Sequence, residues 1–447
     1  MIKTVAIPLY FPGINEREQS ELTAQLDNLK ELYCDVAEFL PPIPVGAQIP
    51  SNADVVVFPQ LAGLAYSQKE ALQSIELPIF VITSEFGTVE MWDWEIVAFL
   101  RDTGLSVFSP YNVDLARCLF RAVAVKSEMK KGVRFLMFQD DPGEGMQAGI
   151  FKRFFWWEDE CTELLEKTFG IKIIYKSYKE LNERAQSIAD SEAENVCSQW
   201  DIPMIDVPRE NYLKSVKLYI AIKQTMTELG DIQGVGANCL NESFSSQTTP
   251  CLAWNMLYEQ DGILWVCEGD TVSLISKYIV YMSLKRPVMM TNIYPFLVGM
   301  AALKHEKIES FPDVPNPDNH ALGVHCGYFG FAPQSFCPQK WILRQKVLEI
   351  VDDNALMVDC EMAEGPVTLA KIHPNLRKII IIESEIKSYE KYPGSDCRNG
   401  ALIHFKNNKG HEIMQTFSSH HALIIQGDCT HELIQMSEVF GFETVVL

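Results

Sequence analysis

Short apolar runs alternate with longer amphipathic segments at the start of the chain. The runs at 5–9, 55–59 and 79–83 are rich in β-branched residues and bounded by Pro, Asp or Ser, which predicts buried parallel strands. Residues 17–32 and 112–130 have apolar positions three and four apart, as on one face of a helix. This alternation predicts a doubly wound α/β domain, whose ligands bind beyond the carboxyl ends of the strands.

The same alternation continues and predicts a second Rossmann-like α/β domain, so that the two domains cover residues 1–130 and 131–310. Its strands are expected at 133–138, 172–177, 235–240, 263–268 and 287–291. One helix is expected to follow the stretch 139–149 and to run to about residue 169. Further helices are expected at 178–194, 209–229 and 271–283.

The last part of the chain, residues 311–447, changes to a pattern dominated by strands. A Pro- and Asn-rich stretch at 311–320 marks the boundary. The strands are joined by Gly, Asn and Pro turns, which predicts a C-terminal β-barrel domain. They are expected at 354–360, 366–372, 378–386, 401–405, 411–417 and 421–426, before a helix at 430–440 and a final strand.

Composition narrows the class of protein. A chain of 447 residues is too long for one core, and its formal net charge of −21 makes a nucleic-acid partner a poor expectation. Its 12 cysteines are scattered without a CxxC pair, which predicts reduced thiols in a cytoplasmic protein. No apolar run is long enough for a membrane span, so no membrane partner is expected.

Carboxylates stand where two strands of the central domain end. Glu242 follows the predicted strand 235–240, and Glu268 closes the run ILWVCE. Asp270 is placed to cap the next helix. A carboxylate at the end of a buried run such as ILWVCE needs a metal, a cation or a proton, so Glu268 is a candidate site residue.

All nine histidines lie between 305 and 431, so any imidazole chemistry comes from the last third of the chain. His420 and His421 stand at the entry of a predicted strand. Neighbouring strand residues point to opposite faces, so only one of the two is expected to face a given centre. Two Glu and one His with open positions suit Mn²⁺, Mg²⁺ or Fe²⁺.

Other motifs are ambiguous. The stretch QDDPGEGMQAG (139–149) is interpreted as a tight strand-to-helix turn rather than a phosphate loop, because it lacks the P-loop Lys and is acidic. His325, in GVHCGYFG, is either a packed side chain or a substrate contact. Trp156 and Trp157 are expected on a helix, in core or interface packing. Trp92 is expected to pack similarly, or to stack on a sugar ring.

The motifs of the C-terminal half, taken in order, resemble those of the L-arabinose isomerase and L-fucose isomerase superfamily. Over roughly 235–447 their order and approximate spacing agree. Glu242 and Glu268 match the two family glutamates, the second in a GEGDWK-like stretch. The remaining matches are IYPF (293–296), LGVH (322–325), GPVTLAK (365–371), SSHHALI (418–424) and GFETVVL (441–447).

The resemblance implies two α/β domains followed by a β-barrel, with the site between the second and third. It implies a divalent metal, usually Mn²⁺, and a homo-oligomer, a trimer or hexamer, whose subunits complete one another's pockets. The implied reaction interconverts an aldose and a ketose, here a pentose or 6-deoxyhexose, through an enediol. Glu242 and Glu268 would be metal ligands and the acid/base pair. His421 would be the imidazole ligand, with His420 and His325 near the substrate.

The chain departs from the family pattern at one ligand. Where the arabinose enzymes have a metal-binding His in xYHF, this sequence has Pro295, and Ser418 and Ser419 replace the Gly pair before the two histidines. Two alternatives therefore stay open. One is a metal-free glycosidase or epimerase that uses the same carboxylate pair. The other is a sugar-binding or regulatory protein without catalysis.

Overall fold

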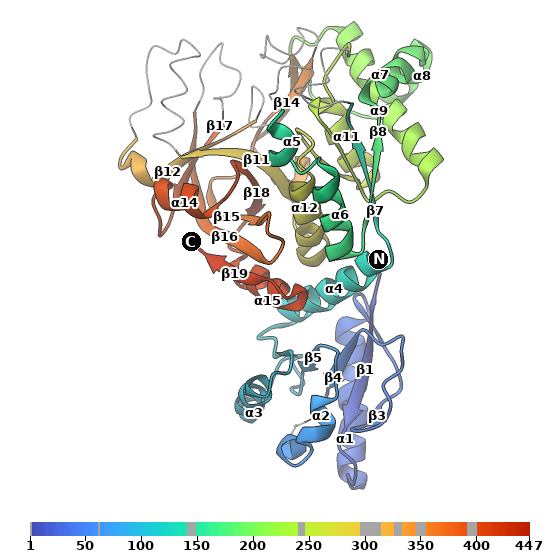
Figure 1. The fold of residues 1–447 in the computed structure, drawn as a ribbon, viewed down its shortest axis with the longest axis vertical. Coiled ribbons are helices and arrows are strands. Elements are labelled where there is room, and N and C mark those ends of the chain that lie inside the picture. Colours follow the sequence, from blue (N-terminus) through green and yellow to red (C-terminus); the bar gives the residue numbers. More distant parts are fainter. Residues whose placement is uncertain are drawn as a thin grey trace. The chain divides into compact units, whose positions relative to one another are not determined.

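The computed structural model describes residues 2–60, 63–140, 149–239, 246–295, 314–325, 333–345, 355–390 and 400–447 (Figure 1). The chain forms two compact units. Unit 1 comprises Met1–Met129, Met282–Leu284 and Ile434–Phe442, and unit 2 comprises Lys130–Tyr281, Lys285–Leu433 and Glu443–Leu447.

A parallel sheet forms the centre of unit 1. Its strands follow the order β2-β1-β4-β5-β6, and β3 pairs on β1. The strands are β1 (Thr4–Tyr10), β2 (Ala37–Phe39), β3 (Ile43–Pro44), β4 (Val55–Phe58), β5 (Ile79–Val81) and β6 (Val107–Phe108). The helices are α1 (Glu16–Tyr33), α2 (Lys69–Gln73), α3 (Met91–Asp102) and α4 (Val113–Lys130).

Both faces of this sheet are covered, which confirms the doubly wound prediction. On β5, Ile79 and Val81 belong to the buried cluster that includes Val97 of α3. Phe80, which points to the other face, packs against Phe120 of α4 with ring centroids 4.9 Å apart. Strand residues that point to either face of the sheet are therefore buried, and this explains why the strands are continuous apolar runs in the sequence.

Unit 2 contains a second parallel sheet, in the order β10-β9-β7-β8. Its strands are β7 (Arg134–Phe138), β8 (Lys172–Lys176), β9 (Gly234–Ala237) and β10 (Leu264–Val266). The helices are α5 (Phe151–Phe154), α6 (Asp159–Phe169), α7 (Tyr178–Ser187), α8 (Asp190–Cys197), α9 (Arg209–Leu229), α11 (Cys251–Asp261) and α12 (Thr271–Leu284). Aromatic side chains join helices to the sheet: Tyr278 of α12 meets Phe135 of β7 edge to face.

Six antiparallel strands of unit 2 close into the predicted barrel (orange and red in Figure 1, with β11 and β12 in yellow). Their order is β15-β18-β11-β12-β17-β16, closed by pairing of β15 with β16, while β19 adds to β16 in parallel. The strands are β11 (Val288–Pro295), β12 (His320–Val324), β15 (Gly365–Ile372), β16 (Lys378–Glu390), β17 (Gly400–Phe405), β18 (His421–Gln426) and β19 (Glu443–Val446). Strands β13 (Lys340–Gln345) and β14 (Leu356–Glu361) pair separately. Helix α15 (Thr430–Phe440) starts in unit 2, and from Ile434 onward it belongs to unit 1.

Two elements differ from the sequence-based predictions. The stretch 411–417, predicted as a strand, is helix α14 (Gly410–Thr416). The Glu412 carboxylate accepts from the backbone N–H of Lys409 at the helix start, and Ile413 and Phe417, one turn apart, are buried on one face. The predicted strand 287–291 is β11, which belongs to the barrel rather than the parallel sheet, because both its partners are antiparallel.

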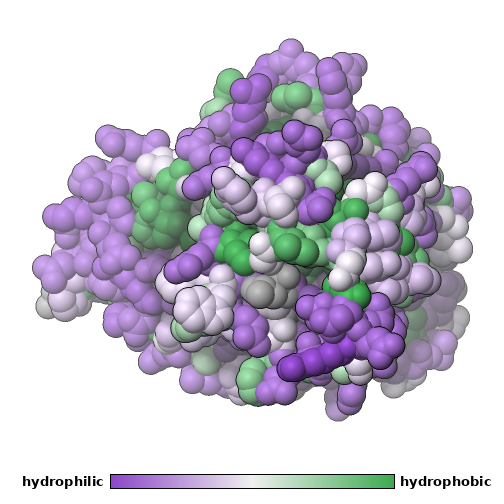
Figure 2. Space-filling model, turned by 90° about the horizontal axis from the view of Figure 1, so that it is seen from below, coloured by the Kyte–Doolittle hydropathy of each residue, from purple (hydrophilic) through white to green (hydrophobic). Residues whose placement is uncertain are grey.

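The surface is consistent with the acidic composition. Figure 2 shows a face covered mostly by hydrophilic residues, with hydrophobic side chains gathered in small patches. None of the helices in the described ranges is both long enough and apolar enough to cross a lipid bilayer.

Candidate metal centre

The chain turns sharply where β10 ends, and this turn carries Glu268. Glu268 has a left-handed φ of 55°, and Gly269 follows with a φ of 68°. A non-glycine residue in this region is strained and persists only where its surroundings hold it. Glu268 is 5% exposed, so the strained turn directs a buried carboxylate away from the end of the strand.

The segment between α5 and α6 holds this turn in place. The indole Nε1 of Trp157 donates to the carbonyl oxygen of Gly269 over 2.5 Å, and the amide of Thr271 donates to the carbonyl of Phe155 over 3.1 Å. Trp156 and Trp157 are buried as expected but are not helical, and Trp156 itself has a φ of 63°. The expectation of a helix here was wrong, because helix α5 ends at Phe154 and the non-helical residues before α6 contact the turn that carries Glu268.

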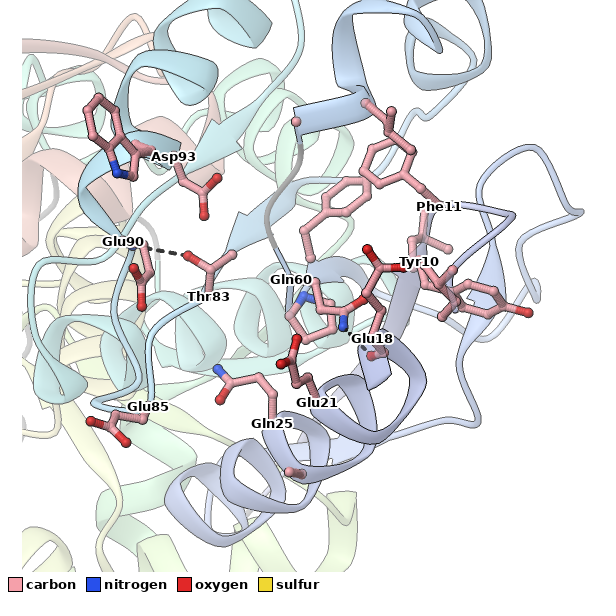
Figure 3. A pocket seen from close by; sticks show the side chains of 18 of the residues that line it. Tyr10, Phe11, Glu18, Glu21, Gln25, Gln60, Thr83, Glu85, Glu90 and Asp93 are labelled. Atoms are coloured by element: carbon pink, nitrogen blue, oxygen red, sulfur yellow. Dashed lines mark hydrogen bonds between the residues drawn. The ribbon is translucent and has the colours of Figure 1, made fainter. Parts of the chain in front are cut away.

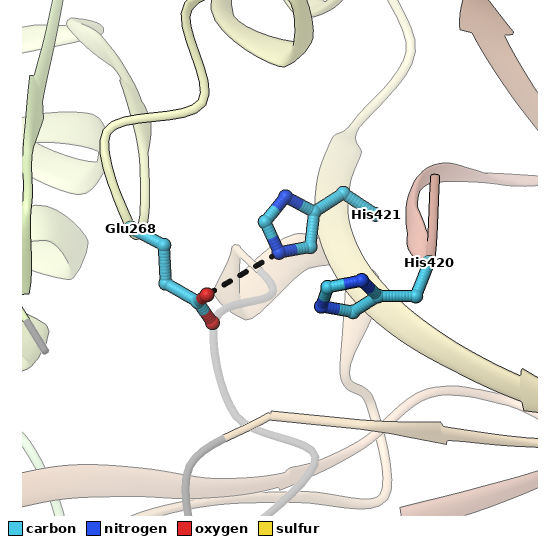
Figure 4. Close-up of side chains that lie close together, drawn as sticks. All are labelled: Glu268, His420 and His421. Atoms are coloured by element: carbon cyan, nitrogen blue, oxygen red, sulfur yellow. Dashed lines mark ion pairs between the residues drawn. The ribbon is translucent and has the colours of Figure 1, made fainter. Parts of the chain in front are cut away.

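Two histidines approach Glu268 from the start of β18 (Figure 4). The Nε2 atom of His421 lies 3.4 Å from Oε2 of Glu268. The ring of His420 lies 4.2 Å from that of His421 and stacks on Tyr294. One ligand atom from each of Glu268, His420 and His421 lies within 4.8 Å of the others. Both imidazoles reach one centre because His420 precedes the strand, so strand alternation does not separate them.

Asp270 is both the helix cap that the sequence predicts and a member of this cluster. Its Oδ1 accepts from the amide of Ser273 at the start of α12 over 2.8 Å. Its Oδ2 accepts from Nζ of Lys371 over 2.6 Å and lies 2.7 Å from Nδ1 of His421. Lys371 and Asp270 are both buried. Phe155 covers the other side, with its ring stacked on His421 at 5.0 Å.

Electrostatics keep the two carboxylates ionised. Burial is the largest single effect and would raise the pKa of Glu268, but the charge and the hydrogen bond of His421, together with the other histidines, outweigh it and lower this pKa to about 2. His325 and His420 act in the same direction, more weakly. For Asp270 the opposing effect of burial is likewise overcome, here by Lys371 and His421, and its pKa is lowered.

The imidazoles respond in opposite directions. Burial disfavours the charged form of His421, but the Glu268 and Asp270 carboxylates outweigh it and raise its pKa. His420 is only partly buried, and this burial together with the charge of His421 lowers its pKa to about 3. His420 is therefore a neutral imidazole near pH 7, with a nitrogen lone pair available for a ligand.

The cluster could hold a metal ion. An ionised Asp270 can only accept, so Nδ1 of His421 carries a proton. The Nε2 atom that faces Glu268 carries either the second proton of an imidazolium, which the raised pKa favours, or a metal ion in its place. Two lone-pair groups 3.4 Å apart need a proton or a cation between them. At bond lengths of about 2.1 Å, two ligands of one ion lie about 3.0–3.5 Å apart. A carboxylate and two imidazoles suit a first-row divalent ion such as Mn²⁺ or Fe²⁺.

The other predicted site residues have different positions. His325 is buried close enough to Glu268 to influence its charge. Glu242 lies outside the described residues. Pro295 stands on the side of β11 that faces α14, because a Cβ on Gly410 would lie 2.8 Å from its Cβ. Pro295 therefore offers no ligand atom at the position that resembles the xYHF histidine.

A second group with possible ligand atoms, Glu158, Glu160 and Cys161, is better explained as an ion-pair cluster. The guanidinium of Arg153 bridges Glu158 and Glu160.

Three features of the cluster were not identified from the sequence: Lys371, Phe155 and Trp157. Lys371 had a usable signal, since it is a cation inside the apolar run PVTLAKI and so needs a buried partner. The two aromatic residues carry no such signal in the sequence, because their contacts depend on where helix α5 ends and helix α6 begins.

A separate cavity of about 1330 Å³ lies within unit 1, beyond the carboxyl ends of β1, β4 and β5 (Figure 3). This is where doubly wound sheets bind ligands. Aromatic and acidic side chains line it, including Tyr10, Phe58, Glu85 and Trp92, and none of the described lining residues is Lys, Arg or His. Such a lining disfavours phosphate groups.

Comparison with models of known protein families, and with curated protein sequences, gives no match for this chain.

Proposed function

We propose that this protein is a metal-dependent sugar isomerase, which interconverts a small aldose and its ketose through an enediol. The observation that carries the proposal is the approach of His421 Nε2 to the Glu268 carboxylate at 3.4 Å, with His420 beside it. The ordered motifs over 235–447 support the same reaction class by resemblance.

The reaction moves a proton between C1 and C2 of the sugar while charge develops on O1 and O2. A divalent ion held by this cluster would supply Lewis-acid stabilisation of that charge. Glu268 and His421 would hold the ion, with Asp270 and Lys371 keeping the imidazole in the required tautomer. The neutral His420 would accept a hydrogen bond from a sugar hydroxyl or donate one to it. Glu242 would share the proton transfer with Glu268, as the resemblance implies.

The test begins with metal content. Full-length protein purified without chelator is compared with Glu268→Gln and His421→Gln, and with Glu412→Gln as a control on the first turn of α14. We expect close to one divalent ion per chain in the wild type and the control, and at least a tenfold loss in the other two. No uptake by the wild type at millimolar Mn²⁺, or equal uptake by Glu268→Gln, would refute this metal centre.

The second step tests the reaction. Metal-loaded protein is incubated in D₂O with a panel of aldopentoses and 6-deoxyaldohexoses, and products are followed by NMR. We expect a ketose with solvent deuterium at C1, and no product from Glu268→Gln or Glu242→Gln. A metal-loaded protein that binds a sugar without turning it over would support the non-catalytic sugar-binding alternative instead.

A further inference from the structure

Two buried cysteines lie side by side next to the turn that carries Glu268. Cys267 is the first residue after β10, and Cys239 follows the end of β9 by two residues. These strands are parallel neighbours, paired from Leu264 opposite Gly234 to Val266 opposite Gly236. The two segments therefore leave the same sheet edge together. The Sγ atoms of Cys239 and Cys267 are 3.2 Å apart.

We propose that Cys239 and Cys267 form a redox-active dithiol, a modification site at which a small peroxide produces a disulfide. A disulfide bond is about 2.05 Å long, so the sulfurs need to approach by only about 1.2 Å. Both side chains are almost fully buried, so only a reagent the size of a peroxide is expected to reach them.

The reaction balances in two steps. One thiol, as its thiolate, attacks the peroxide O–O bond and becomes a sulfenic acid, and the peroxide is reduced to water. The second thiol then attacks the sulfenic sulfur, which forms the S–S bond and releases a second water. Overall the two thiols lose two protons and two electrons, which one peroxide accepts.

The disulfide would act on the metal centre because Cys267 and Glu268 are consecutive. Drawing the Cys267 sulfur toward β9 shifts the start of a turn whose next residue already has a φ of 55°. The 3.4 Å spacing between Glu268 and His421 would then change. This consequence rests on the proposed function, whereas formation of the disulfide does not.

The chemistry is tested by mass spectrometry of the full-length protein. Reduced protein is treated with stoichiometric hydrogen peroxide, alkylated and digested. We expect a linked peptide pair joining Cys239 to Cys267, two hydrogens lighter than the thiols and reversed by dithiothreitol. The exposed Cys34 should be oxidised without being linked. Cys337 and Cys360 are a second pair of buried cysteines joined by a side-chain hydrogen bond, so a link there alone, or no link, would overturn the proposal.

Variants separate the dithiol from its effect on the metal. Cys239→Ala should abolish the link, and Cys118→Ala, a buried cysteine of unit 1, should retain it. Mn²⁺ affinity should fall at least tenfold on oxidation of the wild type, recover with dithiothreitol, and stay unchanged by peroxide in Cys239→Ala. A link that leaves metal affinity unaltered would overturn the regulatory part. A link in a protein that binds no Mn²⁺ in either state would refute the metal centre and leave the dithiol standing.

Discussion

Nδ1 of His421 lies 2.7 Å from Oδ2 of Asp270, and both side chains are at most 1% exposed although the residues are 151 positions apart in the chain. This contact fixes which nitrogen of the imidazole faces Glu268. Partners of this kind behind a metal-binding His orient the ring and raise its basicity.

Replacing Asp270 with Asn tests this orientation. Asn keeps an oxygen to cap α12 but loses the charge that requires a proton on Nδ1. We expect Mn²⁺ affinity to fall 10- to 100-fold, measured by calorimetric titration. Asp270→Ala should weaken binding similarly and cost a further ~1 kcal/mol of stability from the lost cap. Unchanged affinity in Asp270→Asn would contradict the orienting role.

Replacing Lys371 with Met tests the buried ion pair. The side chains of Lys371 and Asp270 are 5% and 1% exposed, so the variant leaves a buried charge without its cation. Breaking such a pair costs about 3–5 kcal/mol of unfolding free energy. Urea unfolding measures this loss. The control is Lys387→Met, whose pair with Glu385 is much more exposed, and we expect it to change stability by less than ~0.5 kcal/mol.

Replacing Gly269 with Ala tests the support from Trp157. A Cβ at Gly269 would lie 2.7 Å from the indole ring, on a backbone with a φ of 68°. Gly262 offers a matched control, since its φ is 66° and a Cβ there meets nothing within 4 Å. Gly262→Ala should cost ~1–2 kcal/mol from the backbone alone. Gly269→Ala should cost more and also weaken Mn²⁺ binding, and equal losses in the two variants would argue against the clash.

Replacing Lys277 with Met tests the buried ammonium through pH. Burial lowers the pKa of Lys277 from its ordinary value of 10.5 to about 7. Between these values the unfolded chain holds a proton that the folded protein has released, so stability rises with pH. Lys277→Met should therefore be more stable than the wild type at pH 6, on the order of a few kcal/mol, and this advantage should shrink toward pH 9.5. In Lys387→Met, a surface control, the difference from wild type should not vary in this way.

The sequence predicted secondary structure best where the spacing of apolar residues repeats along a whole element. The helix predicted at 209–229 is α9, Arg209–Leu229, because its apolar spacing extends over many turns. The strand predicted for the short stretch HEIMQTF was wrong, because the apolar pattern of seven residues fits a strand as well as two turns of helix. The hydrogen bond from the Lys409 amide to the Glu412 carboxylate stabilises the start of the helix instead.

In the candidate site, the apolar run around Glu268 was enough to predict this residue, but the residues that hold its turn in place were not predicted. A carboxylate closing the run ILWVCE is anomalous in the sequence alone, and the structure buries it beside two imidazoles. The support from Trp157 depends on a contact with Gly269, 112 positions away, for which the sequence carries no signal.

The spacing of the site residues along the chain has a consequence for biosynthesis. Asp270 and His421 come from opposite ends of a 151-residue span, and β18 pairs with both β11 and β15. Contacts this distant in sequence form late in folding, because a long loop must close first. A nascent chain therefore has no complete centre until β18 has been synthesised and has entered the barrel. Ion uptake at Glu268 and His421 would then report that β18 has joined the barrel.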